Sequence, residues 1–122
     1  MRVVTQNSIT SGDSSASSIT GSAINASQLI NSYWQVICSA SDAAGTVKIQ
    51  MSNDLPPDGN MASGYTPTHW SDIPSATSAV SSGAGPCIVL ANMSAQWVRA
   101  VYTKSGGGAA SSMSVVMNAQ GI

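Results

Sequence analysis

The chain has 122 residues, a length that suits one domain, and only 7% of them are charged. It carries four Lys or Arg, five Asp, one His and no Glu, whereas ordinary soluble domains contain about 25% charged residues. Acid–base, nucleophilic and metal chemistry need ionisable groups gathered at one point, so this composition argues against an enzyme. The cores of protein interfaces are depleted in charge, and the composition therefore favours an obligate assembly with covered surfaces.

The N-terminal residues predict a strand followed by a polar linker. Val3–Ile9 fits a first strand at a sheet edge, and Ile19–Ala26 alternates weakly between apolar and polar residues. Ser11–Ser18 predicts a polar linker or mobile loop. The hydroxyl-rich stretch Ser8–Ser18, whose one sizeable apolar group is Ile9, cannot offset an ordering entropy of roughly 1–2 kcal/mol per residue. We therefore assign residues 1–18 to an N-terminal arm or edge strand with a serine-rich tether, removable without unfolding the rest, and residues 19–122 to the folded domain.

A hairpin is the clearest local prediction. Two amphipathic runs, Tyr33–Ala40 and Thr46–Ser52, flank the segment Ser41–Gly45, whose Asp and Gly residues suit a turn. Side chains alternate between the two faces of a strand. The residues expected to face the core are Trp34, Val36, Cys38, Ala40, Val47, Ile49 and Met51. Lys48 and Gln50 should face solvent.

The middle of the chain predicts a long loop and two short strands. Asn53–Thr68 contains several Pro and Asp-Gly signals and should be irregular, and loops of this length are usually functional or mobile. His69–Ile73 predicts a short strand that Pro74 ends. Ala76–Val80 predicts another strand.

The C-terminal part supplies the remaining strands. Cys87–Ala91 is apolar throughout and suits a central strand, and Ser112–Ala119 has alternate residues facing inward. In Gln96–Lys104, Val98, Ala100 and Tyr102 share one face. About seven to nine short strands, with turns every 8–12 residues, indicate an all-β fold: a single antiparallel β-sandwich that is jelly-roll-like.

His69 is the residue that comes nearest to a general base. Trp70 and Asp72 follow it, but His69 and Trp70 point to opposite faces of a strand, whereas Trp70 and Asp72 share one. No serine stands in a nucleophile-elbow context. We therefore interpret His69 as a surface or interface residue and expect no catalytic residue.

Asp54 and Asp58 could hold a calcium ion in the long loop, together with neighbouring Asn side chains. The spacing is not that of an EF-hand, and a Pro-Pro pair interrupts it. Asx turns explain these residues more simply. We expect neither a metal nor another cofactor.

Tyr65 is the leading candidate for an exposed contact residue, because nothing in its loop context calls for burial. With Asp54, Asp58 and His69 it forms the predicted contact surface. The other aromatic rings could form a sugar-stacking platform, but core packing explains most of them, since the chain has no Phe. These rings belong to Tyr33, Trp34, Trp70, Trp97 and Tyr102.

The chain has little to attract nucleic acid or membrane. Its four cations are too few and too dispersed for a basic stripe, no run approaches the ~20 apolar residues of a membrane span, and the N-terminus lacks the apolar run of a secretory signal. Cys38 and Cys87 lie in apolar runs and are interpreted as two buried thiols in a reducing compartment, with a disulfide between them as the alternative.

Four segments carry a resemblance to a known group of proteins. These are Gly45–Asp54 (GTVKIQMSND), Trp70–Pro74 (WSDIP), Trp97–Thr103 (WVRAVYT) and the closing Asn118–Gly121 (NAQG). In this order they resemble small β-sandwich virion proteins of bacteriophages, over residues 33–121. The motifs are structural and transfer no catalytic residue.

The resemblance implies a virion structural role, such as a capsid decoration (cement) protein, a head fibre or a tail-associated piece. We expect a small homo-oligomer, with a trimer suiting quasi-threefold capsid positions. Its partners would be the major capsid protein or other virion proteins, and it would reside in the virion after assembly in the host cytoplasm. The alternative function is a receptor- or carbohydrate-binding module displayed on the virion, which rests on Tyr65 and the Asn53–Thr68 loop.

Overall fold

The computed structural model describes residues 2–13, 18–38, 44–55, 65–81, 87–90, 95–106 and 112–121. These residues form nine strands: β1 (Arg2–Asp13), β2 (Ser18–Thr20), β3 (Ile24–Asn25), β4 (Leu29–Cys38), β5 (Ala44–Ser52), β6 (Ser71–Ser81), β7 (Cys87–Leu90), β8 (Trp97–Gly106) and β9 (Ser112–Gly121). A search of the same residues for a helix long and apolar enough to cross a membrane finds none.

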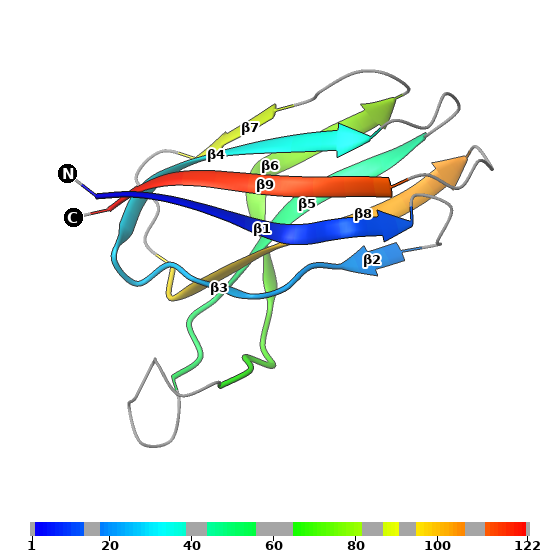
Figure 1. Ribbon diagram of the computed structural model, residues 1–122. Helices are drawn as coiled ribbons and strands as arrows, with labels where there is room; N and C mark the ends of the chain where they lie inside the picture. The colour runs from blue at the N-terminus through cyan, green and yellow to red at the C-terminus, as the bar shows by residue number, and fades with distance from the viewer. Residues whose placement is uncertain are drawn as a thin grey trace.

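The strands form two antiparallel sheets packed as a sandwich (Figure 1). The first sheet has the order β1-β9-β4-β7 and the second the order β2-β8-β5-β6, with the short β3 also pairing with β8. The pairs β1–β9, β2–β8, β4–β7 and β5–β6 are nested in the sequence, as if one long hairpin had been rolled up. This is the strand order of a jelly roll. The predicted all-β, jelly-roll-like sandwich is therefore confirmed.

The core lies between the inner faces of the two sheets and is apolar. Alternate residues of β4, β5, β8 and β9 point into it, as the pleat of a strand requires. The largest fully buried side chains are Trp34, Tyr102, Ile49, Met113, Met117, Val36, Val47, Val98 and Val115. The predicted inward faces of these strands are thus correct for the described residues, with Met51 half-buried against the same core. Ala40, also predicted to face inward, lies outside the described residues. The Trp34 indole N–H is satisfied by the buried Ser32 hydroxyl at 2.8 Å.

The predicted hairpin between Tyr33–Ala40 and Thr46–Ser52 is wrong. β4 pairs with β9 and β7 in the first sheet, whereas β5 pairs with β8 and β6 in the second. The chain therefore passes from one sheet to the other between β4 and β5, and residues 41–43 of the predicted turn lie outside the described residues. Both strands bury one face in a shared core, and a period-two pattern identifies that face without identifying the neighbouring strand.

The edges of the sheets correct two further predictions. Pro74 does not end a strand, because β6 continues through an irregularity in its pairing with β5, where Ser75 adopts a φ of 64°. Proline is tolerated there because β6 is an edge strand. The apolar strand Cys87–Leu90 also lies at an edge, beside β4, and not at the centre of its sheet.

The two cysteines lie at different register positions in the first sheet. Cys38 is a buried free thiol, and the register of β4 with β7 sets Cys87 opposite Gln35, three residues away from Cys38. The side chain of Cys87 lies outside the described residues. The buried thiol predicted at Cys38 is therefore confirmed.

The N-terminal residues form a long edge strand in the first sheet. β1 pairs with β9 from Arg2 to Asp13, and β2 begins at Ser18, so strand replaces the tether predicted over Ser8–Ser18 at residues 8–13 and at Ser18. Residues 14–17 lie outside the described residues. Of the two predicted forms of this segment, the structure has the edge strand for residues 2–13, and the domain boundary at residue 18 stays a prediction.

Ser8 connects this edge strand to the second sheet. Its buried hydroxyl accepts the backbone N–H of Ala100 in β8 at 2.9 Å and donates to the carbonyl of Ser22 at 3.0 Å. The backbones come so close here that a Cβ on Gly21 would lie 2.7 Å from the Ala100 carbonyl oxygen. Ser8 therefore satisfies backbone groups that neither sheet pairs at this point.

We expect Ser8→Ala to lower the free energy of unfolding by about 1–3 kcal/mol, because the Ala100 N–H then stays buried without a partner. Urea denaturation measures this change. Ser71→Ala, on the exposed side of β6, is the matched control and should change it by about 0.5 kcal/mol or less. Equal effects of the two substitutions would contradict the bridging role of Ser8.

Candidate functional site

The two described ends of the segment between β5 and β6 lie against the outer face of the second sheet. Trp97 alternates with the inward-facing Val98 and so points outward from β8, yet it is buried. Its indole N–H donates to the carbonyl of Asp54 at 3.1 Å, and the Tyr65 ring lies above it, with 6.3 Å between ring centroids. Residues 53–55 and 65–70 therefore cover Trp97 on the outer face, and we call them the covering segment.

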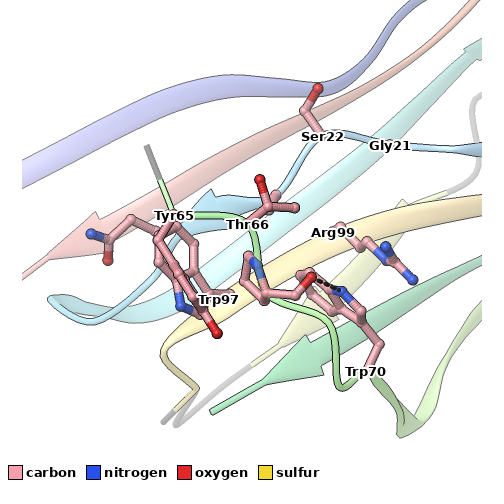
Figure 2. A pocket seen from close by; sticks show the side chains of 10 residues that line it. Gly21, Ser22, Tyr65, Thr66, Trp70, Trp97 and Arg99 are labelled. Carbon is pink, nitrogen blue, oxygen red and sulfur yellow. Dashed lines mark hydrogen bonds between the residues drawn. The ribbon is translucent and has the colours of Figure 1, made fainter. Parts of the chain in front are cut away.

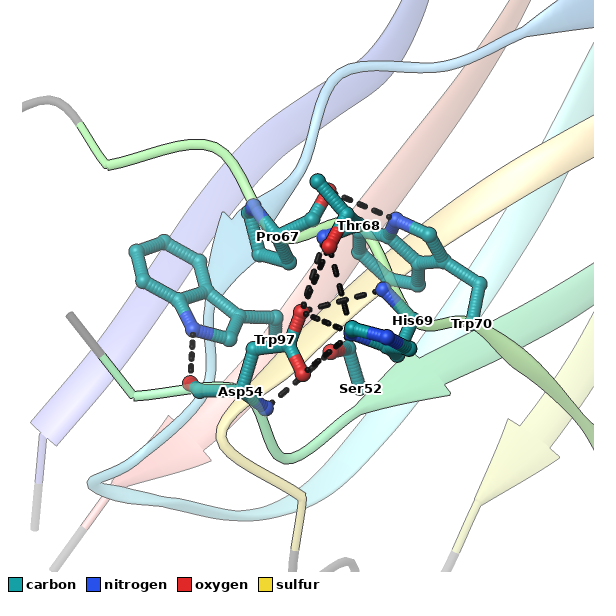
Figure 3. A network of polar contacts seen from close by, with 7 residues as sticks. All are labelled: Ser52, Asp54, Pro67, Thr68, His69, Trp70 and Trp97. Atoms are coloured by element: carbon teal, nitrogen blue, oxygen red, sulfur yellow. Dashed lines mark hydrogen bonds and ion pairs between the residues drawn. The ribbon is translucent and has the colours of Figure 1, made fainter. Parts of the chain in front are cut away.

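Asp54 holds the two ends of this segment together (Figure 3). Its carboxylate accepts the backbone N–H of Thr68 at 2.8 Å and that of His69 at 3.0 Å, and it lies 3.1 Å from His69 Nδ1. Its own N–H donates to the Ser52 hydroxyl at 3.1 Å. Both oxygens of the carboxylate are thus engaged within the protein.

Hydrogen bonding lowers the pKa of Asp54 from its ordinary value of 3.8. The N–H of Thr68 contributes most, followed by that of His69, because both stabilise the charged form. A carboxyl whose pKa is lower in the folded state than in the unfolded state stabilises the fold. This stabilisation is complete above the pKa of the unfolded state, near 4, and is lost as the pH falls through the pKa of the folded state. The anchoring of this segment should therefore weaken only in acid.

We expect Asp54→Ala to release the segment at neutral pH, so that Trp70 and Trp97 become more exposed. Their fluorescence emission should shift to longer wavelength at pH 7, whereas the wild-type protein should show such a shift only below about pH 4. Asp72→Ala removes the same charge without touching these backbone groups and serves as the control. Unchanged emission in Asp54→Ala across the titration would contradict the anchoring role.

The structure brings together two of the four predicted contact residues. Asp54 and His69 are in contact, although the His69 side chain is 86% exposed. Tyr65 is half-buried beside Trp97 and not fully exposed as its context predicted, and its role as a contact residue stays a prediction. Asp58 lies outside the described residues.

Asp72, the carboxylate nearest to His69 in the sequence, contacts Lys48 and Gln50 instead of His69. The Asp54–His69 contact takes its place, with the Thr68 hydroxyl 3.1 Å from the same ring nitrogen. Among the described residues, no three His, Cys, Asp or Glu side chains gather in a way that would hold a metal ion. The backbone N–H groups that the Asp54 carboxylate accepts lie 14 and 15 positions away, so these contacts are not the Asx turn that its context predicted.

A chain of polar contacts runs across the outer face of the second sheet. Asp72 accepts from Lys48 Nζ at 3.2 Å and from the Gln50 amide at 2.9 Å, and these two bonds lower its pKa. Gln50 Oε1 in turn accepts the Nε–H of Arg99 at 2.9 Å. The Arg99 guanidinium lies 4.1 Å from the centre of the Trp70 ring, a cation–π contact. Arg99 is therefore held in place from two sides.

A groove of about 570 Å³ lies between this covering segment and the connection from β2 to β3 (Figure 2). The residues that line it are Gly21, Ser22, Ala23, Asn25, Tyr65, Thr66, Pro67, Trp70, Trp97 and Arg99. Three of them are aromatic and one is a cation. We call this the Arg99 groove.

The sequence did not single out this groove. Core packing was the expected role of most aromatic rings. Trp34 and Tyr102 are in the core as predicted, whereas Trp70 and Trp97 lie on the outer face of the second sheet and Tyr33 is exposed on the first. The alternation of side chains along β8 did place Trp97 and Arg99 on one face, and this was the feature of the sequence that could have indicated the groove. No feature of the sequence indicated that the β2–β3 connection lines the groove, because its position depends on long-range packing.

The outer face of the first sheet differs in character. Large apolar side chains are exposed on its described part: Val3 is 63% exposed, Tyr33 45% and Ile37 54%. The register places hydroxyl, amide and apolar residues around them, namely Thr5, Asn7, Asn31, Gln35, Ser114, Val116, Asn118 and Gln120. Among residues whose side chains the structure describes, this face carries no charge. We call it the uncharged face.

Comparison with known proteins yields one distant structural likeness to report. No family model and no curated protein matches the sequence. Among solved structures, a chain in the structure of infectious bursal disease virus Gx strain matches 97% of this chain at 17% identity, with a TM-score of 0.43. This chain covers 31% of that one. A likeness at this level carries no argument about function.

Proposed function

We propose that the protein is a bacteriophage virion structural protein, a capsid decoration (cement) protein that binds the outer capsid lattice as a small homo-oligomer. The observation that carries this proposal is the uncharged face. Val3, Tyr33 and Ile37 are exposed on it without a described charged side chain among them. Depletion of charge around exposed apolar residues is typical of surfaces that become the core of an interface.

The mechanism is mechanical. An interface that spans neighbouring capsid subunits adds binding free energy that a bare shell lacks, and a standard-sized interface buries about 1,600 Å² in total. Self-association through a closed cyclic arrangement, as a trimer at a quasi-threefold position, would repeat each contact without open ends. The jelly roll suits this role by analogy, since viral capsid domains often use it.

The composition and the resemblance to phage virion proteins add support. A net charge of −1 gives copies little mutual repulsion. The absence of any enzymatic role stays a proposal of the same kind. It is supported by the contacts of Asp54, whose carboxylate serves backbone groups, and by the exposed position of His69.

A single lysine on the uncharged face tests the proposal. Ile37→Lys should weaken binding to capsid shells that lack the protein by about tenfold or more, because a charge must be desolvated at the interface. Leu55→Lys is the matched control, since Leu55 is 63% exposed but lies outside this face. Co-sedimentation with the shells measures binding, and sedimentation velocity measures the oligomeric state. Equal binding by both variants would reject this face as the interface.

A further inference from the structure

We propose that the Arg99 groove binds an acidic saccharide, whose carboxylate pairs with Arg99 and whose ring packs against Tyr65 and Trp70 (Figure 2). The groove lies on the second sheet, whereas the uncharged face belongs to the first sheet. The inference therefore goes beyond the assembly role and does not depend on it.

Arg99 is prepared for a carboxylate. Its Nε–H donates to Gln50 and its planar group lies over Trp70, so its orientation is fixed before any ligand arrives. No further hydrogen bond joins its guanidinium to another described residue. The two terminal amino groups therefore keep donors for a bidentate pair with a carboxylate, which is among the stronger polar contacts in proteins.

The neighbouring acidic groups do not neutralise Arg99. The Asp54 carboxylate is engaged by Thr68 and His69, and Asp72 is engaged by Lys48 and Gln50. Neither aspartate lines the groove. Its described lining thus carries one positive charge and no negative one, which favours a ligand with a single carboxylate.

The remaining lining fits a sugar ring. Tyr65 and Trp70 are half-buried, so each ring keeps an accessible part beside the guanidinium. Ser22, Asn25 and Thr66 are exposed around the groove and supply hydroxyl and amide groups for sugar hydroxyls. A few polar groups around an apolar floor are typical of small-molecule sites.

A nucleic acid fits less well than an acidic saccharide. Phosphate chains are bound through several cations along one path, and Lys48, the next described cation on this face, is already paired with Asp72 at 3.2 Å. A neutral sugar would offer the terminal amino groups of Arg99 no carboxylate for a bidentate pair. The charge of the groove therefore selects for a carboxylate.

Calorimetric titration of the full chain with sialyllactose, with a glucuronate-containing oligosaccharide and with lactose tests the proposal. We expect at least one of the two acidic ligands to bind about tenfold or more tightly than lactose; which of them binds identifies the sugar. Arg99→Lys, which keeps the charge but loses the planar fork, and Tyr65→Ala should each weaken that binding by about fivefold or more. Lys104→Ala, which removes a charge outside the groove, should not.

Thermal unfolding of each variant separates loss of binding from loss of fold. No binding of either acidic ligand to the wild-type chain would overturn the proposal. So would unchanged binding in a folded Arg99→Lys variant, or equal binding of inorganic phosphate or a short oligonucleotide. None of these results bears on capsid binding, which is measured separately.

Discussion

Removal of residues 1–18 should leave a chain that no longer holds the sandwich. β1 pairs with β9 between Arg2 and Asp13 with two irregularities, Ile9 lies in the core and Ser8 bridges to β8. Loss of one buried Ile side chain alone costs about 2–5 kcal/mol, and whole domains are stable by only about 5–15 kcal/mol. Circular dichroism and thermal unfolding of the truncated chain measure the effect.

Two substitutions in β1 test its role in stability without truncating the chain. Ile9→Ala should destabilise the protein strongly, whereas Val3→Ala, at a position 63% exposed, should change the unfolding free energy by about 0.5 kcal/mol or less. A truncated chain that unfolds cooperatively at the wild-type temperature would show that residues 1–18 form the removable arm expected from their composition. That outcome would contradict the integral role of β1.

Ile49→Ala should lower the free energy of unfolding by about 2–5 kcal/mol. Ile49 is fully buried in β5, so the substitution loses transfer free energy and leaves a cavity. Lys48→Ala, at the adjacent position, removes a surface ion pair with Asp72 and should cost about 1 kcal/mol or less. Urea denaturation of both variants measures the contrast. Similar effects would mean that the faces of β5 are exchanged, as a one-residue slip in register produces.

The alternation of side chains predicted which residues face the core but not which strands pair. Val47, Ile49 and Tyr102 point inward as their spacing indicated. The neighbours of β5 proved to be β6 and β8, the latter far along the chain, and not the preceding strand β4. Periodicity is a local property, whereas pairing in a jelly roll depends on contacts between distant segments.

The candidate site shows the same division. Asp54 and His69 were singled out from their residue types, but their contact spans 15 positions and depends on how the segment folds back. In the sequence, Arg99 is one of four scattered cations, and no motif marks it as a binding residue. Its significance comes from Gln50 and Trp70, which the packing of β5, β6 and β8 brings beside it. Sequence reasoning therefore found the anchors of the covering segment and missed the groove.

The proposed role as a virion protein is tested most directly by the composition of purified particles. Mature virions from a host that expresses the native gene can be banded by density, washed in high salt and analysed by quantitative mass spectrometry. The proposal predicts that this chain co-purifies with the major capsid protein in a fixed stoichiometric ratio, on the exterior, where protease digestion of intact particles removes it. Its absence from washed, infectious particles would contradict the proposal.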